Sequence, residues 1–358
     1  MNLIVPMAGQ SARYPGLRPK WMLTHPNGHF MAVEAMTGLN FEDFEKISLV
    51  FLQAHEDKYH FQLGLREELE DLRLLEKTEL LFLQEPTRDQ PETVAKAIQC
   101  LKIHGPILAK DSDNCFSARI QPGNSVCYYD LNSAGLIKPR NKSYLIKDDR
   151  GHVVNIVEKQ VISPYFCVGG YGFADAEEYL RFYDRLSGKE SIYLSNIIFE
   201  MLLSKKTFQA LPVQSYVDWG TVEDWDNYKR SFGTLFIDMD GVLVYNSSCH
   251  FSPRYGESEP LRENAGIIKQ LRDSGKFQIV ITTSRPEKYR FVTERQLQDL
   301  GIHYDYLLMG LYHSKRIVIN DYSKSNPYKS CDAINLKRDS DELREILRES
   351  LGIDYEEI

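Results

Sequence analysis

The chain alternates short apolar runs with longer stretches in which leucines recur every three or four residues. The apolar runs of its first half lie at Leu3–Val5, Ile47–Phe51, Leu80–Leu83, Ile107–Leu108 and Val153–Val157. Between two of them, Lys58–Leu75 has leucines mostly at three- and four-residue spacing, which is typical of an amphipathic helix. Strands that alternate with helices predict an α/β fold, because parallel strands need a crossover connection.

A second strand–helix pattern begins abruptly at Thr234–Asp238. Further strands are expected at Phe277–Ile281, Tyr306–Met309 and Arg316–Ile319, and further helices at Glu263–Asp273, Lys288–Leu300 and Ser340–Leu351. We therefore predict two Rossmann-like α/β domains, residues 1–230 and 231–358. The linker near Lys229–Gly233 is only a few residues long, so we expect the domains to abut.

The composition is that of a soluble protein, with 42% hydrophobic and 26% charged residues. The formal net charge of −8 argues against nonspecific DNA binding, so no nucleic-acid partner is expected. No apolar run reaches the roughly 18 residues of a membrane span, and the chain opens directly on an expected strand. We therefore expect neither membrane insertion nor a signal peptide. The six cysteines form no Cys-x-x-Cys pair, which predicts reduced thiols and a cytoplasmic protein; they are Cys100, Cys115, Cys127, Cys167, Cys249 and Cys331.

A turn of small residues follows the first expected strand. It contains Ala8, Gly9 and Ser11, and the bases Arg13 and Lys20 follow it. Small residues let backbone N–H groups approach a phosphate, and ligands of α/β sheets collect at the carboxyl ends of the strands. The two bases would neutralise a triphosphate, so the turn is a candidate phosphate-binding loop. A solvated tight turn is the alternative interpretation.

Ala8-Gly9-x-Ser11-x-Arg13 with Pro19-Lys20 resembles the opening signature of the nucleotidyltransferases that make NDP-sugars and CDP-alcohols. Ser11 stands where that family usually has its second glycine. The resemblance continues over roughly 230 residues, through Gln84–Thr93 and the Glu-Lys…Gly-x-Tyr type of segment that starts at Glu158. It implies these further binding residues: Thr87, Gln90 and Thr93 for the base, and Glu158, Lys159 and Gly170 for the phosphate of the second substrate.

Two acidic turns far apart in the sequence each follow a short apolar strand. The first contains Asp111 and Asp113, and the second contains Asp218. Taken singly, each acid is also compatible with a solvated strand end. The resemblance implies that Asp113 and Asp218 are Mg²⁺ ligands, with Asp111 as a weaker third candidate. Two carboxylates that meet at one cleft repel each other unless a cation lies between them, and Mg²⁺ binds one or two carboxylates together with substrate phosphates.

The reaction that this resemblance implies is nucleotidyl transfer. A phosphate oxygen of the acceptor attacks the α-phosphorus of an NTP in line, and pyrophosphate leaves. Arg13 and Lys20 would neutralise the triphosphate, and Lys159 would orient the acceptor phosphate. No general base is needed, because the attacking phosphate is already ionised at neutral pH.

Polar residues also stand at the expected strand ends of the second half. Asp238 and Asp240 follow its first strand, Thr283 follows the next, and Lys315 and Asp321 flank the last. Over roughly 125 residues they resemble the motifs of the haloacid dehalogenase superfamily of phosphohydrolases. The resemblance implies that Asp238 is a nucleophile that forms an aspartyl-phosphate and that Asp240 is the general acid and base. Thr283 and Lys315 would bind the phosphoryl group, and Asp238, Asp240 and Asp321 would hold Mg²⁺.

We therefore interpret the chain as a bifunctional enzyme, a nucleotidyltransferase fused to a phosphatase, with at least one Mg²⁺ site in each domain. The expected substrates are an NTP, with CTP preferred, and a phosphorylated sugar or polyol used for a surface polysaccharide. The spacings after Asp240 leave no room for a large cap domain, so the second site is open or is covered by the N-terminal domain or by another subunit of a homo-oligomer. Two alternatives stay open: a transferase whose second domain only binds a ligand or builds an oligomer, and a non-catalytic nucleotide sensor.

Overall fold

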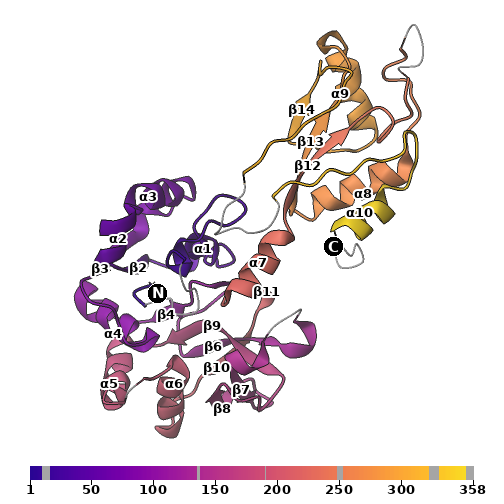
Figure 1. Ribbon diagram of the computed structural model, residues 1–358. Coiled ribbons are helices and arrows are strands. Elements are labelled where there is room, and N and C mark those ends of the chain that lie inside the picture. Colours follow the sequence, from indigo (N-terminus) through magenta and orange to yellow (C-terminus); the bar gives the residue numbers. More distant parts are fainter. Residues whose placement is uncertain (10–16, 135–137, 190, 248–252, 322–329, 352–358) are drawn as a thin grey trace. The chain divides into compact units, whose positions relative to one another are not determined.

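The computed structural model describes residues 1–9, 17–134, 138–189, 191–247, 253–321 and 330–351. The chain divides into two compact units, Met1–Asn227 and Tyr228–Ile358 (Figure 1). Both units contain parallel strands and helices, so the predicted α/β class is confirmed. Among the described residues, no helix combines the length and the apolar character that crossing a membrane would take.

A nine-stranded mixed sheet forms the centre of the first unit. Its strands are β1 (Asn2–Pro6), β2 (Lys46–Leu52), β3 (Thr78–Leu83), β4 (Ile107–Lys110), β6 (Ser125–Asp130), β7 (Ser143–Lys147), β8 (Val153–Glu158), β9 (Tyr165–Phe173) and β10 (Gln209–Pro212). Strands β4, β1, β2 and β3 run parallel in this order, and β9 runs antiparallel between β4 and β6. The carboxyl ends of the parallel strands therefore meet at one edge of the sheet, where α/β proteins bind ligands.

Both faces of this sheet are covered, because the strand residues alternate between two separate cores. Leu3 and Val5 of β1 lie in one core and Ile4 lies in the other. The helices of the unit are α1 (Met31–Glu34), α2 (Gln53–Tyr59), α3 (Gln62–Asp71), α4 (Gln90–Leu101), α5 (Ala176–Leu186), α6 (Leu194–Leu203) and α7 (Val222–Arg230). Helices α4, α5 and α6 lie in a row on the face that contains Ile4 (Figure 1).

The single helix predicted over residues 58–75 is two helices in the structure. His60 has a left-handed conformation, φ 50° and ψ 46°, and ends α2 with its N–H donating to the carbonyl of Glu56. Leu65 and Leu69 form the buried stripe of α3, whereas Leu63 is 70% exposed. Leucine spacing therefore identified the buried face of α3 but not the break before it.

A separate two-stranded ribbon joins distant parts of the first unit. β5 (Asn114–Ser117) pairs antiparallel with β11 (Gln214–Asp218), and this register sets Asp218 opposite Asn114. The ribbon therefore brings the turn after β4 next to the last strand of the unit.

The second unit contains a three-stranded parallel sheet in the order β12–β13–β14. Its elements are β12 (Gly233–Asp238), α8 (Arg262–Asp273), β13 (Phe277–Thr282), α9 (Arg290–Asp299), β14 (Tyr306–Leu308) and α10 (Leu343–Leu351). Ile237 and Ile281 pack in one core with Ile268 of α8 and Leu347 of α10. The carboxyl ends of β12 and β13 lie side by side, because Asp238 is opposite Thr282 in the register.

The strand predicted over residues 316–319 is wrong. In the described residues this segment joins no sheet, and Ile317 and Ile319 are 75% and 91% exposed. Apolar β-branched residues favour extended structure, but a strand also needs a partner that accepts its backbone hydrogen bonds. Asp321, which we expected at the end of this strand, therefore does not stand at a strand end.

Candidate functional site

The first unit contains a cavity of about 870 Å³ at the carboxyl ends of its central strands. The predicted site residues that line it are Gly9, Lys20, Thr87, Gln90, Thr93, Asp111, Asp113, Glu158, Lys159 and Asp218. Ala8 and Gly170 are buried beside lining residues. Ser11 and Arg13 lie outside the described residues, so their placement stays a prediction.

Hydrogen bonds tie the end of β1 to the loop before α4. The carbonyl of Ala8 accepts from the N–H of Thr87 at 3.3 Å and from its hydroxyl at 3.4 Å. The hydroxyls of Thr87 and Thr93 are 2.6 Å apart, and both residues are buried. Asp89 caps α4 by accepting from the N–H of Glu92, at 2.9 Å. The start of α4 is therefore held beside the small-residue turn, with its N-terminus at the cavity.

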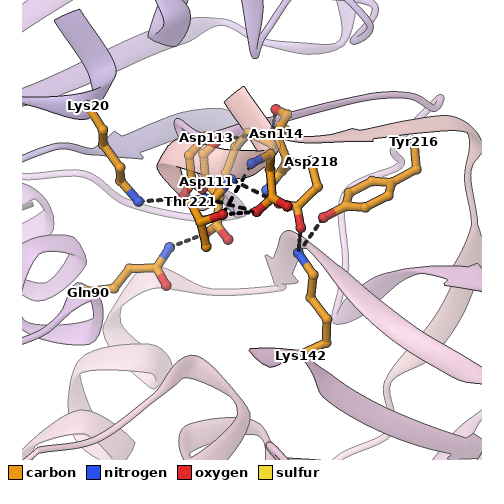
Figure 2. A network of polar contacts seen from close by, with 12 residues as sticks. Lys20, Gln90, Asp111, Asp113, Asn114, Lys142, Tyr216, Asp218 and Thr221 are labelled. Atoms are coloured by element: carbon orange, nitrogen blue, oxygen red, sulfur yellow. Dashed lines mark hydrogen bonds and ion pairs between the residues drawn. The ribbon is translucent and has the colours of Figure 1, made fainter. Parts of the chain in front are cut away.

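Three carboxylates meet lysine and glutamine side chains on the cavity wall (Figure 2). Asp111 follows β4 directly and accepts from the side-chain amide of Gln90. Asp113 forms an ion pair with Lys20, which a short 3₁₀ turn at Lys20–Met22 positions. Asp218, at the end of β11, forms an ion pair with Lys142 at 2.6 Å. Strand pairing thus assembles groups that are more than 100 residues apart in sequence.

The carboxyl of Asp111 lies close to Asp113 in the turn after β4. Burial raises its pKa, and the negative charge of Asp113 raises the pKa further. The N–H of Asp111 donates to the carbonyl of Gly169 at 2.8 Å. Gly169 has φ +77°, and a Cβ there would collide with the Asp111 carboxylate. The close approach of these two backbones therefore requires glycine at position 169.

A fully buried lysine shapes the turn between β4 and β5. The ammonium of Lys110 donates to the carbonyl and the side-chain oxygen of Asn114, at 2.9 and 2.7 Å, and to the carbonyl of Asp111 at 2.7 Å. Burial lowers the pKa of Lys110. The acceptors, Asp111 and Asn114, stand on either side of Asp113, so Lys110 fixes the backbone that carries that carboxylate.

The donor set of this cluster fits Mg²⁺. The groups are carboxylate oxygens, the ligands that a hard cation prefers, and burial together with the nearby charge of Asp113 raises the pKa of Asp111. Among the described residues, no three His, Cys, Asp or Glu side chains are placed as a complete metal site. A cation here would complete its ligand shell with oxygens from water or from a substrate, as Mg²⁺ commonly does when it binds one or two carboxylates.

The Glu158–Lys159 pair also lines the cavity. Glu158 accepts from the hydroxyls of Ser143 and Ser195, the latter at 2.8 Å. The ammonium of Lys159 donates to the hydroxyl of Tyr193 and lies 4.5 Å from the centre of that ring. Glu158 is therefore a fixed acceptor, whereas Lys159 is a cation at the cavity surface.

Sequence reasoning missed Lys142, which has no place in any motif that we identified. Its carbonyl accepts from the N–H of Lys159 at 3.0 Å, because β7 and β8 form an antiparallel hairpin that pairs Ser143 with Glu158. Knowledge of the hairpin register would have identified Lys142, because the register places this second lysine beside Lys159.

In the second unit, Asp240 is held by a buried arginine. Both oxygens of Asp240 accept from Arg285, at 2.8 and 2.7 Å, and Thr283 donates a longer bond of 3.4 Å. The Arg285 side chain is fully buried and also donates to Gln296 and Thr293, at 2.9 and 3.3 Å. Sequence reasoning had assigned no role to Arg285.

Asp238 lies next to this network at the end of β12. Burial raises the pKa of its carboxyl, and its Oδ1 accepts from Arg316 at 3.3 Å. Lys315 and Asp321 are both exposed in the segment where we expected a strand. The structure thus brings Asp238, Asp240 and Thr283 to one edge of the sheet, and within the described residues no strand carries Lys315 and Asp321 there.

Comparison with known proteins identifies the fold. No family model and no curated protein sequence matches the chain. Among solved structures, the nucleoside-diphosphate-sugar pyrophosphorylase from Vibrio cholerae RC9 is similar, with a TM-score of 0.52 and 18% identity over 63% of this chain and 98% of its own. The inositol-1-phosphate CTP transferase from T. maritima is also similar, with a TM-score of 0.51 and 16% identity over 64% of this chain and 93% of its own. The first unit comprises a similar share, 227 of 358 residues. Over about 63% of its length, this chain has the fold of these nucleotidyltransferases.

Proposed function

We propose that the first unit transfers a nucleotidyl group from an NTP to the phosphate of a sugar or polyol and releases pyrophosphate. The observation that carries this proposal is the cavity itself, in which Asp113, Asp218, Lys20 and Lys159 converge beside the turn after β1. The activities for which the V. cholerae and T. maritima proteins of this fold are named, sugar-nucleotide pyrophosphorylase and CTP transferase, agree with it.

The residues of the cavity supply alignment and charge for this reaction. Lys20 and the N–H groups after β1 would bind the triphosphate, and Lys159 would orient the acceptor phosphate. A Mg²⁺ ion on Asp113 and Asp218 would neutralise charge on the phosphate oxygens. The acceptor oxygen forms a bond to the α-phosphorus as the bond from that phosphorus to the pyrophosphate oxygen breaks. The Thr87–Thr93 hydroxyl pair and Gln90 at the start of α4, which line the same cavity, would bind the base.

Pyrophosphate release from a panel of NTPs tests this proposal. Each of CTP, UTP, dTTP, ATP and GTP is incubated with Mg²⁺ and a set of sugar and polyol phosphates. We expect release that depends on the acceptor, and we expect CTP to react fastest, because the turns at Ala8–Ser11 and Lys110–Asn114 resemble those of cytidylyltransferases. If no pair of substrates releases pyrophosphate, the proposal is wrong; if another NTP is faster, only the choice of base is wrong.

We propose a second activity, phosphate-monoester hydrolysis, for the C-terminal unit. It is favoured by Asp238, which ends β12, and Thr283, which follows the adjacent parallel strand β13, so that both lie at one sheet edge. A carboxylate oxygen of Asp238 would bond to the phosphorus as the bond to the alcohol oxygen breaks, and water would then release inorganic phosphate. In this arrangement Asp240 must leave Arg285 to protonate the alcohol. Removal of one phosphate from a bisphosphorylated precursor would supply the acceptor of the first unit.

Changing Asp238 to Asn is expected to abolish hydrolysis of p-nitrophenyl phosphate with Mg²⁺, because an amide cannot form the acyl-phosphate. The matched control is Asp273→Asn at the C-terminal end of α8, before the turn that leads to the amino end of β13, which should retain the wild-type rate. Unchanged phosphate release by the Asp238 variant contradicts the hydrolase proposal. A wild-type protein that releases no phosphate favours the alternative of a unit that only binds a ligand.

A further inference from the structure

Lys142 occupies a position that conflicts with a cation at Asp218. Its ammonium lies 2.6 Å from Asp218 Oδ2 and 2.7 Å from the hydroxyl of Tyr216, and 5.2 Å from the centre of the Tyr216 ring. The side chains of Lys142 and Asp218 are only 14% and 11% exposed. Both residues line the cavity, and Figure 2 shows Lys142 approaching the carboxylates from another side than Lys20.

A divalent cation and an ammonium compete for the same carboxylate. They attract the same oxygens and repel each other, and the repulsion is strong in a half-buried site. A cation that binds Asp218 therefore weakens the hold of Asp218 on Lys142. The lysine side chain is long and flexible, so its ammonium moves to another partner without any change in the backbone.

The nearest alternative partner is an anion at Lys159. The backbones of Lys142 and Lys159 are joined by a 3.0 Å hydrogen bond at the open end of the β7–β8 hairpin, and both side chains line the cavity. If the Lys142 ammonium turned from Asp218 toward Lys159, the two ammonium groups would repel each other unless an anion lay between them. A phosphate dianion held by Lys159 satisfies this condition.

We propose that Lys142 is the counter-ion of Asp218 in the metal-free protein and that a divalent cation displaces it onto the phosphate of the acceptor. Cation binding thus completes the acceptor site, and the two ligands favour each other's binding. This inference rests on the proposed transfer function for the identity of the acceptor, but the competition at Asp218 is independent of it.

The competition is tested with Mn²⁺ alone on the full-length protein without nucleotide, by electron paramagnetic resonance. The bound Mn²⁺ is assigned to Asp218 if the Asp218→Asn variant no longer binds it. We expect Lys142→Met to bind Mn²⁺ about tenfold more tightly than the wild type, because a competing positive charge is gone. Lys138→Met is the matched control, since Lys138 pairs with Glu223 outside the cavity and both are exposed; it should bind Mn²⁺ as the wild type does.

Lys142→Gln is the second variant and is used if Lys142→Met fails to fold. It removes the positive charge but keeps a hydrogen-bond donor for the hydroxyl of Tyr216. If Lys142→Met and Lys142→Gln both bind Mn²⁺ only as tightly as the wild type or more weakly, the proposal is overturned. Where the NTP panel yields an active pair of substrates, we also measure the two KM values of the Lys142 variants. We expect the KM of the acceptor to rise about tenfold above that of the wild type, while the KM of the NTP stays within about twofold. An unchanged acceptor KM overturns the displacement onto phosphate. If the panel yields no active pair, the transfer function fails, and the Mn²⁺ titration still decides the competition.

Discussion

Changing Asp113 to Asn is expected to lower kcat of nucleotidyl transfer by about 10²- to 10³-fold, the loss typical of removing one preorganised charge from a phosphoryl or acyl transition state. The amide keeps the shape of the side chain but removes the charge that binds Lys20 and would bind the cation. The measurement is steady-state pyrophosphate release as a function of Mg²⁺ concentration, with thermal unfolding to show that the variant folds.

The control for this prediction is Asp71→Asn, an exposed residue at the end of α3, which should keep wild-type kinetics. The double variant Asp113→Asn/Asp218→Asn should be little slower than either single variant, because both carboxylates serve one cation and their effects do not add. If the two single losses multiply in the double variant, the carboxylates act independently and the shared cation site is wrong.

Changing Arg285 to Met is expected to destabilise the second unit by about 3–5 kcal/mol, the usual cost of removing one partner of a buried ion pair. The variant leaves Asp240 without its two guanidinium bonds and removes the donor to Gln296. All three tryptophans, Trp21, Trp219 and Trp225, belong to the first unit. Unfolding in urea is therefore followed by tryptophan fluorescence for the first unit and by far-ultraviolet circular dichroism for both.

The expected result for Arg285→Met is an earlier dichroism transition with an unchanged fluorescence transition. Arg290→Met is the matched control: Arg290 also forms ion pairs with two acids, Glu287 and Glu294, but on the exposed side of α9, where such pairs contribute little. Its dichroism transition should stay at the wild-type midpoint. Equal shifts in the two arginine variants would contradict the role that we assign to burial of Arg285.

Much of the fold was predictable because strand position depends on local pattern. The apolar runs at residues 3–5, 47–51 and 277–281 all lie within strands of the structure. The acid-ended strands predicted two acidic turns, and the structure places Asp113 and Asp218 on one cavity wall. Their roles as metal ligands stay predictions, as does the role of Lys20.

What the sequence did not reveal depends on partners that are distant along the chain. The register of the β7–β8 hairpin brings Lys142 to the cavity. Packing of α9 buries Arg285 beside Asp240. The strand that we predicted at 316–319 was wrong for a related reason. Its residues favour extended structure, but no described strand pairs with them. Local pattern indicates what a segment prefers, whereas pairing and burial decide what it does.

The β5–β11 ribbon sets the order in which the cavity is assembled. Its two strands are about a hundred residues apart, so their pairing is a long-range contact that forms only after most of the first unit has been synthesised. A chain released before Gln214 has β1 to β4 and the turn with Asp113, but it lacks Asp218 and therefore the partner of Lys142. The cavity therefore gains its full set of carboxylates only with the last strand of the first unit, so a product truncated before Gln214 lacks a complete site even where the strands of the large sheet are present.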